Sequence, residues 1–274
     1  MTPHKYLTLF LIISALHSCK RECKVVKQTF SNGRPKETLI YPKCGDTSLY
    51  KRQYHYNSGQ LESEGWVING EKDGEYKSWF SNGKQSANWQ IKNGKEDGFI
   101  QCWYENGNKK KEVTLENGIE NGIENGISKY WFENGKLQSN GQYIDGKQNG
   151  VWTYLQLNGA WTLRTYKNGR LNGLTKEHLI DSLEGIKIVA GQFQDGKETG
   201  VWKWFDEDSI LYQTATYVDG TYLGEYKRFY KNGLVELSGF LKGENTRDGE
   251  FLYYDTMGKL SKKEYWKEGK QLHK

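Results

Sequence analysis

Residues 127–150 read ISKYWFENGKLQSNGQYIDGKQNG, and this 24-residue pattern sets the architecture of the chain. Residues 75–98 (EYKSWFSNGKQSANWQIKNGKEDG) and 99–122 (FIQCWYENGNKKKEVTLENGIENG) repeat it, with Asn-Gly at the same place in all three copies. Another Asn-Gly or Asp-Gly follows about ten residues later. These dipeptides favour two-residue type I′ turns, because both central residues of that turn have positive φ. The flanking stretches are short and rich in aromatic and β-branched residues, so each copy is predicted to be a β-hairpin.

The pattern extends over residues 51–274 as nine units of 23 to 27 residues, with a four-residue duplication at 123–126. A degraded copy at residues 29–41 is predicted to cap the array within the segment 19–50. A single hairpin cannot bury its aromatic face alone, so the units must stack. The predicted fold class is therefore all-β: an elongated stack of antiparallel β-hairpin repeats, forming a ribbon or solenoid. Within it, the stretch Thr175–Leu183 favours a short helical turn.

The composition excludes several classes of protein. Thirty-two glycines stand against only three prolines, too few for collagen or a Pro-rich linker. Aromatic residues make up 14% of the chain and supply the large side chains of a core. The net charge is +5, and basic and acidic residues alternate along the chain. A nucleic-acid-binding protein more often gathers its basic residues on one stripe, so no nucleic-acid partner is expected.

The N-terminus carries the features of a secretion signal. An apolar run, Tyr6–Leu16, follows a weakly basic start and is too short to span a bilayer. The sequence Leu16-His17-Ser18-Cys19 resembles the bacterial lipobox. The resemblance implies a signal peptide at residues 1–18, a lipid on Cys19 and a location in the bacterial cell envelope, facing the periplasm or the cell surface. The alternative is an ordinary signal peptide followed by a free cysteine.

Three further cysteines follow Cys19. Cys23 and Cys44 flank the first structured segment, and they are either joined in a disulfide or present as two free thiols. A disulfide closing a loop of this length would contribute about 3 kcal/mol to stability. Cys102 lies alone in a strand-like stretch and is expected to be a buried thiol. No CxxC motif occurs, so neither a metal site nor a redox site is expected.

The repeat unit resembles the bacterial variant of the MORN repeat. The best examples run from Gly126 through Trp131-Phe132 and Asn134-Gly135 to Gly150, and from Gly224 through Phe229-Tyr230 to Asn232-Gly233. The resemblance covers 51–274 and implies a MORN-like ribbon of nine hairpin repeats. It also implies membrane-associated scaffolding with lipid or protein contacts. Proteins of this type are often catalogued as antitoxin components of toxin–antitoxin systems.

The sequence offers no constellation typical of an enzyme. HExxH, GxSxG and P-loop motifs are absent from it, and no cofactor is expected. His55 and His178 stand in repeat slots that hold Trp or Phe elsewhere, so a packing role is expected for both. The acidic residues recur beside turns, where a carboxylate stays solvated and is poorly suited to general acid catalysis.

The recurring aromatic residues are the remaining candidates for a binding site. They occupy two slots of the unit: Trp79, Trp103 and Trp131 share one, and Trp152, Trp202 and Tyr226 share the other. In a regular stack, equal slots align along the ribbon. The rings either form a core ladder that holds the units together or leave one ladder exposed to grip a partner.

These features together predict a non-enzymatic repeat scaffold that is anchored to a membrane through its N-terminal lipid. Its partner is expected to be a protein, a glycan or a lipid surface. The alternative function is that of an antitoxin or immunity-type inhibitor of one specific toxin.

Overall fold

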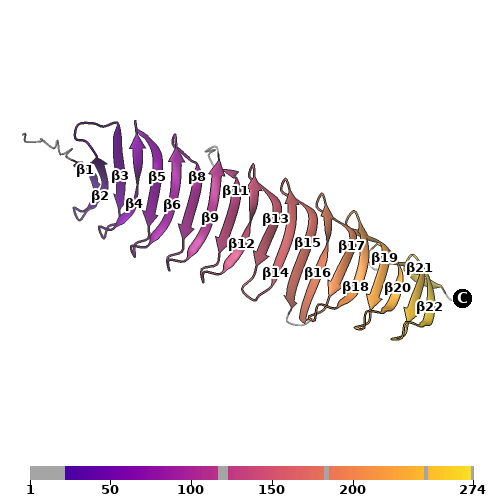
Figure 1. The fold of residues 1–274 in the computed structure, drawn as a ribbon. Coiled ribbons are helices and arrows are strands. Elements are labelled where there is room, and N and C mark those ends of the chain that lie inside the picture. Colours follow the sequence, from indigo (N-terminus) through magenta and orange to yellow (C-terminus); the bar gives the residue numbers. More distant parts are fainter. Residues whose placement is uncertain (1–21, 117–122, 182–184, 244–245, 273–274) are drawn as a thin grey trace, which may run out of the picture.

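The computed structural model describes residues 22–116, 123–181, 185–243 and 246–272. Within these residues the chain forms 23 β-strands in one sheet, and the described part contains no helix. That part consequently offers no helix long and apolar enough to cross a membrane. Figure 1 shows the strands side by side in an elongated ribbon.

The strands of the N-terminal half are β1 (Cys23–Thr29), β2 (Pro35–Tyr41), β3 (Leu49–His55), β4 (Leu61–Ile68), β5 (Glu71–Trp79), β6 (Gln85–Lys92), β7 (Lys95–Glu96), β8 (Gly98–Trp103), β9 (Lys109–Glu116), β10 (Ile123–Glu124), β11 (Gly126–Trp131) and β12 (Leu137–Ile144). Those of the C-terminal half are β13 (Lys147–Leu155), β14 (Trp161–Lys167), β15 (Arg170–Asp181), β16 (Gly185–Gln194), β17 (Lys197–Phe205), β18 (Leu211–Val218), β19 (Thr221–Phe229), β20 (Val235–Lys242), β21 (Arg247–Tyr254), β22 (Leu260–Lys267) and β23 (Lys270–Leu272).

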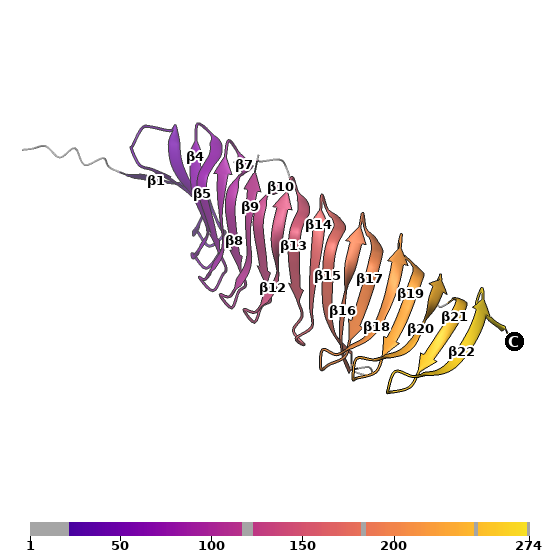
Figure 2. The same cartoon turned by 45° about the vertical axis from the view of Figure 1, so that its right-hand side comes forward.

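Consecutive strands pair along the ribbon, except that the short strands β7 and β10 each pair with one neighbour, and every pairing is antiparallel. Two strands are interrupted: β6 pairs with both β7 and β8, and β9 pairs with both β10 and β11. The sheet is open, with β1 at one end of the ribbon and β23 at the other (Figure 2). The predicted all-β stack of antiparallel hairpins is confirmed.

The helical turn predicted at Thr175–Leu183 is wrong for the described part of that stretch. Residues up to Asp181 continue β15, which pairs with β16 from Gly173 to Asp181 without a register shift. Continuous pairing with β16 overrides the local helical preference of this short stretch. Residues 182–184 lie outside the described part of the chain.

The two ends of the hairpins use different turns. At one end both central residues have positive φ, as at Asn93-Gly94 and Asp145-Gly146, and this is the predicted type I′ turn. At the other end only the glycine has positive φ, as at Gly83 and Gly135. There the prediction of a two-residue turn is wrong, because a three-residue turn followed by a bulge places the asparagine in a different conformation.

The asparagines of these three-residue turns link neighbouring repeats. Asn106 Oδ1 accepts a hydrogen bond from the backbone N–H of Asn108 (2.8 Å), which closes its own turn. Its Nδ2 donates to the carbonyl of Glu133 in the next turn (2.8 Å). Asn82 makes the same pair of bonds to Lys84 and Glu105. The recurrence of Asn-Gly therefore has a structural cause, since each asparagine satisfies groups of two turns.

From β5 onward, a glycine with positive φ recurs in or directly beside the first strand of the hairpins. Gly150 is an example: residues 150–152 face Gly141 alone on the neighbouring strand, between the pairs Asn140–Thr153 and Gln142–Asn149. Such a bulge bends the strand and increases its twist. The same irregularity recurs at Gly74 and Gly200. Because of the bulge, the side chain two residues after the glycine lies over the neighbouring strand, as Trp152 lies over Gly141.

The core consists of large rings that lie over glycines. Tyr76, Trp152, Trp202 and Phe251 cover, in that order, Gly65, Gly141, Gly191 and Gly239 of the preceding strand. A Cβ atom at any of these glycines would overlap the ring. Where the preceding strand carries a bulky residue, the covering residue is smaller, as in the pair Val113 and Ser128, both fully buried. A large side chain on one strand is thus matched by a small residue on the neighbouring strand, and together they fill the core of this single-layer sheet.

Both ends of the ribbon are closed by specific contacts. At the N-terminal end Cys23 and Cys44 form a disulfide, with 5.2 Å between their Cα atoms. At the C-terminal end Glu264 lies opposite Phe251 and is almost buried. Its carboxylate accepts hydrogen bonds from Tyr253, Arg247 and the indole of Trp266, at 2.7, 3.1 and 3.0 Å. A charged and fully paired residue therefore ends the apolar ladder.

Candidate binding surface

The sheet has an inner face, which carries the core, and an outer face. Within a hairpin we number positions from the residue after the bulge glycine, so that Trp152 is at position 2 after Gly150. Positions 2 and 4 lie on the inner face, because they include the buried residues and their contacts. Since side chains alternate along a strand, positions 1, 3 and 5 lie on the outer face.

The second predicted set of aromatic residues lies on the inner face. Trp152 is 1% exposed and Trp202 is 7% exposed, so both rings belong to the core. Trp152 Nε1–H donates to the carbonyl of Gln142 (3.0 Å), which satisfies its polar group inside the sheet. Tyr226 is half-buried and packs against the cluster of Leu237, Leu241 and Phe251. A partner on the outer face cannot touch these rings.

The first predicted set lies on the outer face, at position 5. Trp79, Trp103 and Trp131 are each half-buried. These three residues belong to a row of side chains that runs along the sheet, which we call the aromatic row although it includes one leucine. Its members are His55, Trp79, Trp103, Trp131, Leu155, His178, Phe205, Phe229 and Tyr254. Lys109 lies over the ring of Trp131, with its Nζ 5.6 Å from the ring centroid. Equal slots of the repeat therefore do align, and their rings remain partly accessible.

The two histidines belong to the aromatic row. The ring of His178 stacks on Trp161 at 5.7 Å with an interplanar angle of 8°. Burial and the nearby Lys24 lower the pKa of His55 below its ordinary value. The Nδ1 atoms of both rings are buried without a hydrogen-bond partner among the described residues. Both rings thus pack as members of a row of large side chains.

An exposed row of apolar side chains lies beside these rings, at position 1. We call it the aliphatic row, although its first member is aromatic: Phe99 (48% exposed), Ile127 (63%), Val151 (54%), Leu174 (61%) and Val201 (53%). Strand spacing near 4.8 Å, with two strands to a repeat, gives the row a length of about 40 Å. Each member follows a bulge glycine directly in the sequence. The same slot holds Glu75 before the row and Glu225 after it.

A row of lysines runs between the aliphatic and aromatic rows, at position 3. This lysine row consists of Lys77, Lys129, Lys176, Lys203 and Lys227, while Gln101 and Thr153 hold the same position in two intervening repeats. Glu112 lies opposite Lys129 on the preceding strand. The end members of the lysine row form ion pairs with Glu75 (2.8 Å) and Glu225 (2.6 Å). The side chains between the three central lysines are mostly uncharged, as at Asn140, Ala190 and Thr214, which the register places opposite them. The middle of the outer face is therefore apolar and basic.

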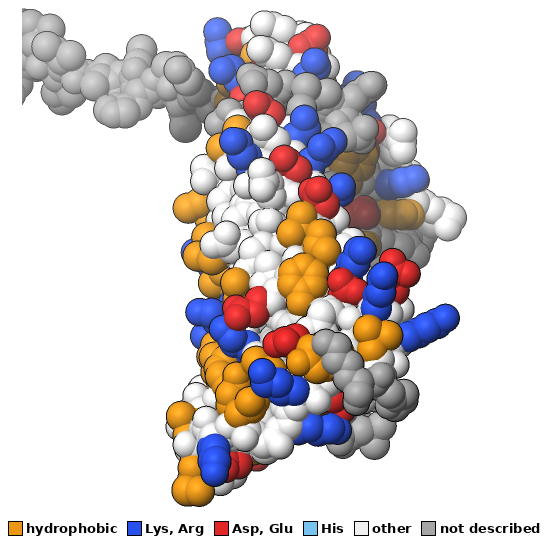
Figure 3. Space-filling model, turned by 90° about the vertical axis from the view of Figure 1, so that its right-hand side faces the viewer, with side chains coloured by type: hydrophobic (Ala, Val, Ile, Leu, Met, Phe, Trp, Pro, Cys, Tyr) orange, Lys and Arg blue, Asp and Glu red, His pale blue; other side chains and the backbone are white. Residues whose placement is uncertain are grey.

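Figure 3 looks along the ribbon from its C-terminal end, where hydrophobic, basic and acidic side chains are all visible at the surface. The sequence reasoning missed the aliphatic row because it searched for aromatic residues. The signal was present as an apolar residue directly after the last glycine of five successive units.

The other predicted site residues have simpler positions. Cys19 lies outside the described residues. Cys102 is half-buried as a free thiol, and burial raises its pKa above the ordinary value, which lowers its reactivity. In the part of the chain that the structure describes, no group of three or more His, Cys, Asp or Glu residues is placed to hold a metal ion.

The comparison with known proteins identifies the repeat. The family described as MORN repeat variant matches residues 124–145 and 198–219. Each segment begins four residues before position 2, which is Ser128 in the first and Trp202 in the second. Each ends at the first central residue of a type I′ turn, Asp145 or Asp219, so the two segments cover the same part of the hairpin. No curated protein matches the chain. The chain thus contains MORN-variant repeats, built here as bulged β-hairpins of one continuous sheet.

Proposed function

We propose that the chain is a non-enzymatic repeat scaffold of the bacterial cell envelope, anchored by a lipid on Cys19, whose outer face rests on an anionic lipid surface. The aliphatic row beside the lysine row is the observation that supports this most directly. Aliphatic side chains lower their free energy by leaving water, and each lysine near an anionic membrane surface contributes about 1 kcal/mol. Half-buried tryptophans suit the boundary between headgroups and acyl chains.

The position of Cys19 is compatible with this arrangement. Cys19 lies four positions before Cys23, where β1 begins, and an extended chain over that distance in sequence spans at most about 14 Å. A lipid at Cys19 would hold the first hairpin close to the bilayer. The row of outer-face side chains would then supply the further contacts that keep the ribbon on the membrane. The alternative function as a toxin inhibitor gains nothing from the comparison, which matches the repeat alone.

Two measurements test the anchor and the surface separately. First, Cys19→Ala should abolish labelling by a fatty-acid analogue in cells. Second, the chain expressed from Lys20 onward, and so without lipid, should sediment with phosphatidylglycerol vesicles and be released by salt. It should bind phosphatidylcholine vesicles far less.

The variant Val151→Glu/Val201→Glu should lose sedimentation, because it places carboxylates in the aliphatic row. Met257→Glu is the matched control, since Met257 is 82% exposed at a turn outside the row. Equal sedimentation of all three proteins, or none with either vesicle, would reject the lipid surface as partner.

A further inference from the structure

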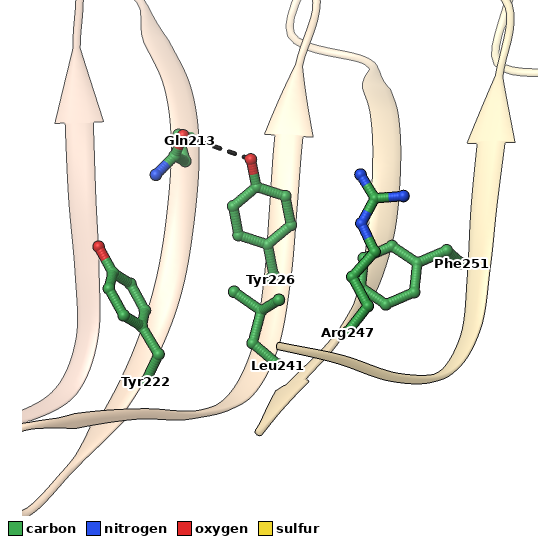
Figure 4. A pocket seen from close by; sticks show the side chains of 6 residues that line it. All are labelled: Gln213, Tyr222, Tyr226, Leu241, Arg247 and Phe251. Atoms are coloured by element: carbon green, nitrogen blue, oxygen red, sulfur yellow. Dashed lines mark hydrogen bonds between the residues drawn. The ribbon is translucent and has the colours of Figure 1, made fainter. Parts of the chain in front are cut away.

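The inner face contains a cleft near the C-terminal end of the ribbon. Its volume is about 270 Å³, and six side chains from the successive strands β18 to β21 line it (Figure 4): Gln213, Tyr222, Tyr226, Leu241, Arg247 and Phe251. Ligand pockets for drug-sized molecules are ordinarily about 300–1,000 Å³, so this cleft has room for about one ring. It lies on the opposite side of the sheet from the aliphatic row.

The cleft exists because one ring of a ladder is replaced by leucine. From the middle of the chain onward, the return strands carry a ring on the inner face two residues after the position that faces the core ring, a position held by Gly141, Arg164, Gly191, Ala215 and Glu264. These rings are Tyr143, Tyr166, Phe193, Tyr217 and Trp266. These rings pack on the core rings, with centroid distances of 4.9 Å for Tyr143–Trp152 and 5.3 Å for Phe193–Trp202. Leu241 takes this position between Tyr217 and Trp266. The shorter side chain leaves the space of a missing ring.

Polar groups with fixed positions surround that space. Arg247 lies with its guanidinium 4.7 Å from the ring centroid of Phe251 and 4.9 Å from that of Trp266. One of its nitrogens donates to the hydroxyl of Tyr253 (2.9 Å) and to Glu264 (3.1 Å). A guanidinium has five N–H donors, so this anchoring leaves others to serve a ligand. On the facing side, Figure 4 shows the hydroxyl of Tyr226 pointing to Gln213, to whose Oε1 it donates (3.4 Å).

We propose that this cleft binds one pyranose ring of a carbohydrate. The C–H face of a sugar ring stacks on aromatic side chains such as Tyr222 and Tyr226, which are only partly buried, and its hydroxyls pair with the amide of Gln213 and the guanidinium of Arg247. The aromatic side chain of a protein partner would fill the same volume. It would bury the donors of Gln213 and Arg247 without partners, which costs free energy.

Titration of the full chain with methyl α-glucoside, methyl β-galactoside and methyl N-acetyl-β-glucosaminide, followed by NMR, tests the proposal. At least one glycoside should bind saturably, with a dissociation constant in the millimolar range. Leu241→Phe restores the ring of the neighbouring repeats and should abolish binding without lowering the thermal midpoint. Val218→Phe adds a ring to the exposed outer face of the same region and should leave binding unchanged.

Gln213→Ala provides a second variant in case Leu241→Phe does not fold, and it should weaken binding about tenfold. Saturation by none of the three glycosides would overturn the proposal. Wild-type binding by both cleft variants would overturn it as well. Indole is the competing probe, and its saturable binding in the absence of glycoside binding would assign the cleft to an aromatic side chain instead. None of these outcomes depends on binding to lipid vesicles.

Discussion

The indole ring of Trp152 covers Gly141 on the neighbouring strand so closely that a Cβ atom at Gly141 would overlap it. Gly141 itself does not have positive φ, so its role is to leave room for the ring and not to permit an unusual backbone. The pairs Tyr76–Gly65, Trp202–Gly191 and Phe251–Gly239 repeat the arrangement. Each core ring and the glycine that it covers on the preceding strand therefore form one structural unit.

Gly141→Ala should destabilise the protein by about 1–3 kcal/mol, because the added methyl group must displace a ring that is 1% exposed. The double variant Gly141→Ala/Trp152→Tyr should recover part of this loss, since Tyr226 naturally lies opposite Ala215. The midpoint of chemical denaturation measures both effects. Asn140→Ala, on the same strand, is the control and should change the midpoint little. Equal midpoints for Gly141→Ala and this control would show that the ring moves freely.

Much of the fold could be predicted from the sequence, because Asn-Gly and Asp-Gly recur at fixed spacing between strand-like stretches. The turn type could not be predicted. Asn82-Gly83 and Asn93-Gly94 are the same dipeptide, yet φ is positive at Asn93 and not at Asn82. The difference depends on whether the hairpin bulges beside the turn, which the dipeptide alone does not specify.

The candidate surfaces were only partly predictable for a related reason. The sequence shows that aromatic slots align but not which face each slot occupies, because each bulge glycine changes the simple alternation along the strand. Trp131 and Trp152 looked like equal candidates, and the structure places one on the outer face and the other in the core. The spacing of eleven residues from Gly141 to Trp152, and from Gly191 to Trp202, was an available sign of the core pair.

Asn106→Ala should cost more stability than Asn134→Ala. Asn106 closes its own turn and also donates to the next turn at Glu133, whereas for Asn134 the described hydrogen bond is the one from the backbone N–H of Lys136 (3.0 Å). Each net hydrogen bond contributes about 1 kcal/mol, so the two variants should differ by about that amount. Thermal midpoints measured side by side provide the test. A larger loss for Asn134→Ala would contradict a linking role of the asparagine side chain.

Glu264 should make the C-terminal end of the ribbon sensitive to acid. Hydrogen bonds from Lys262 and Tyr253 lower its pKa from 4.5 to about 2. A carboxyl group whose pKa is depressed in the folded state stabilises that state above its ordinary pKa. The contribution is therefore lost as the pH falls from about 4.5 through about 2.

Glu264→Gln should flatten the dependence of the thermal midpoint on pH in this window, while Glu250→Gln, at an exposed position of the preceding strand, should not. Tryptophan fluorescence reports the change, since Trp266 donates to Glu264. Parallel pH profiles for the wild type and Glu264→Gln would count against this role.

Deletion of residues 192–215 should leave a folded, shorter ribbon. The deletion joins Gly191 to Thr216, which places Tyr226 over Gly191 in the way that Tyr76 lies over Gly65. Deletion of residues 75–98 removes the same length but brings Ile100 over Gly65, and the smaller side chain leaves a cavity. This protein should fold with a lower thermal midpoint. Deletion of 204–215 removes the end of β17, the turn and the start of β18, which fuses the rest of the two strands into one. Every later strand would then have to reverse its direction or exchange its two faces. Circular dichroism and size-exclusion chromatography should show this last variant unfolded or aggregated, and equal behaviour of all three deletions would refute pairwise stacking of the hairpins.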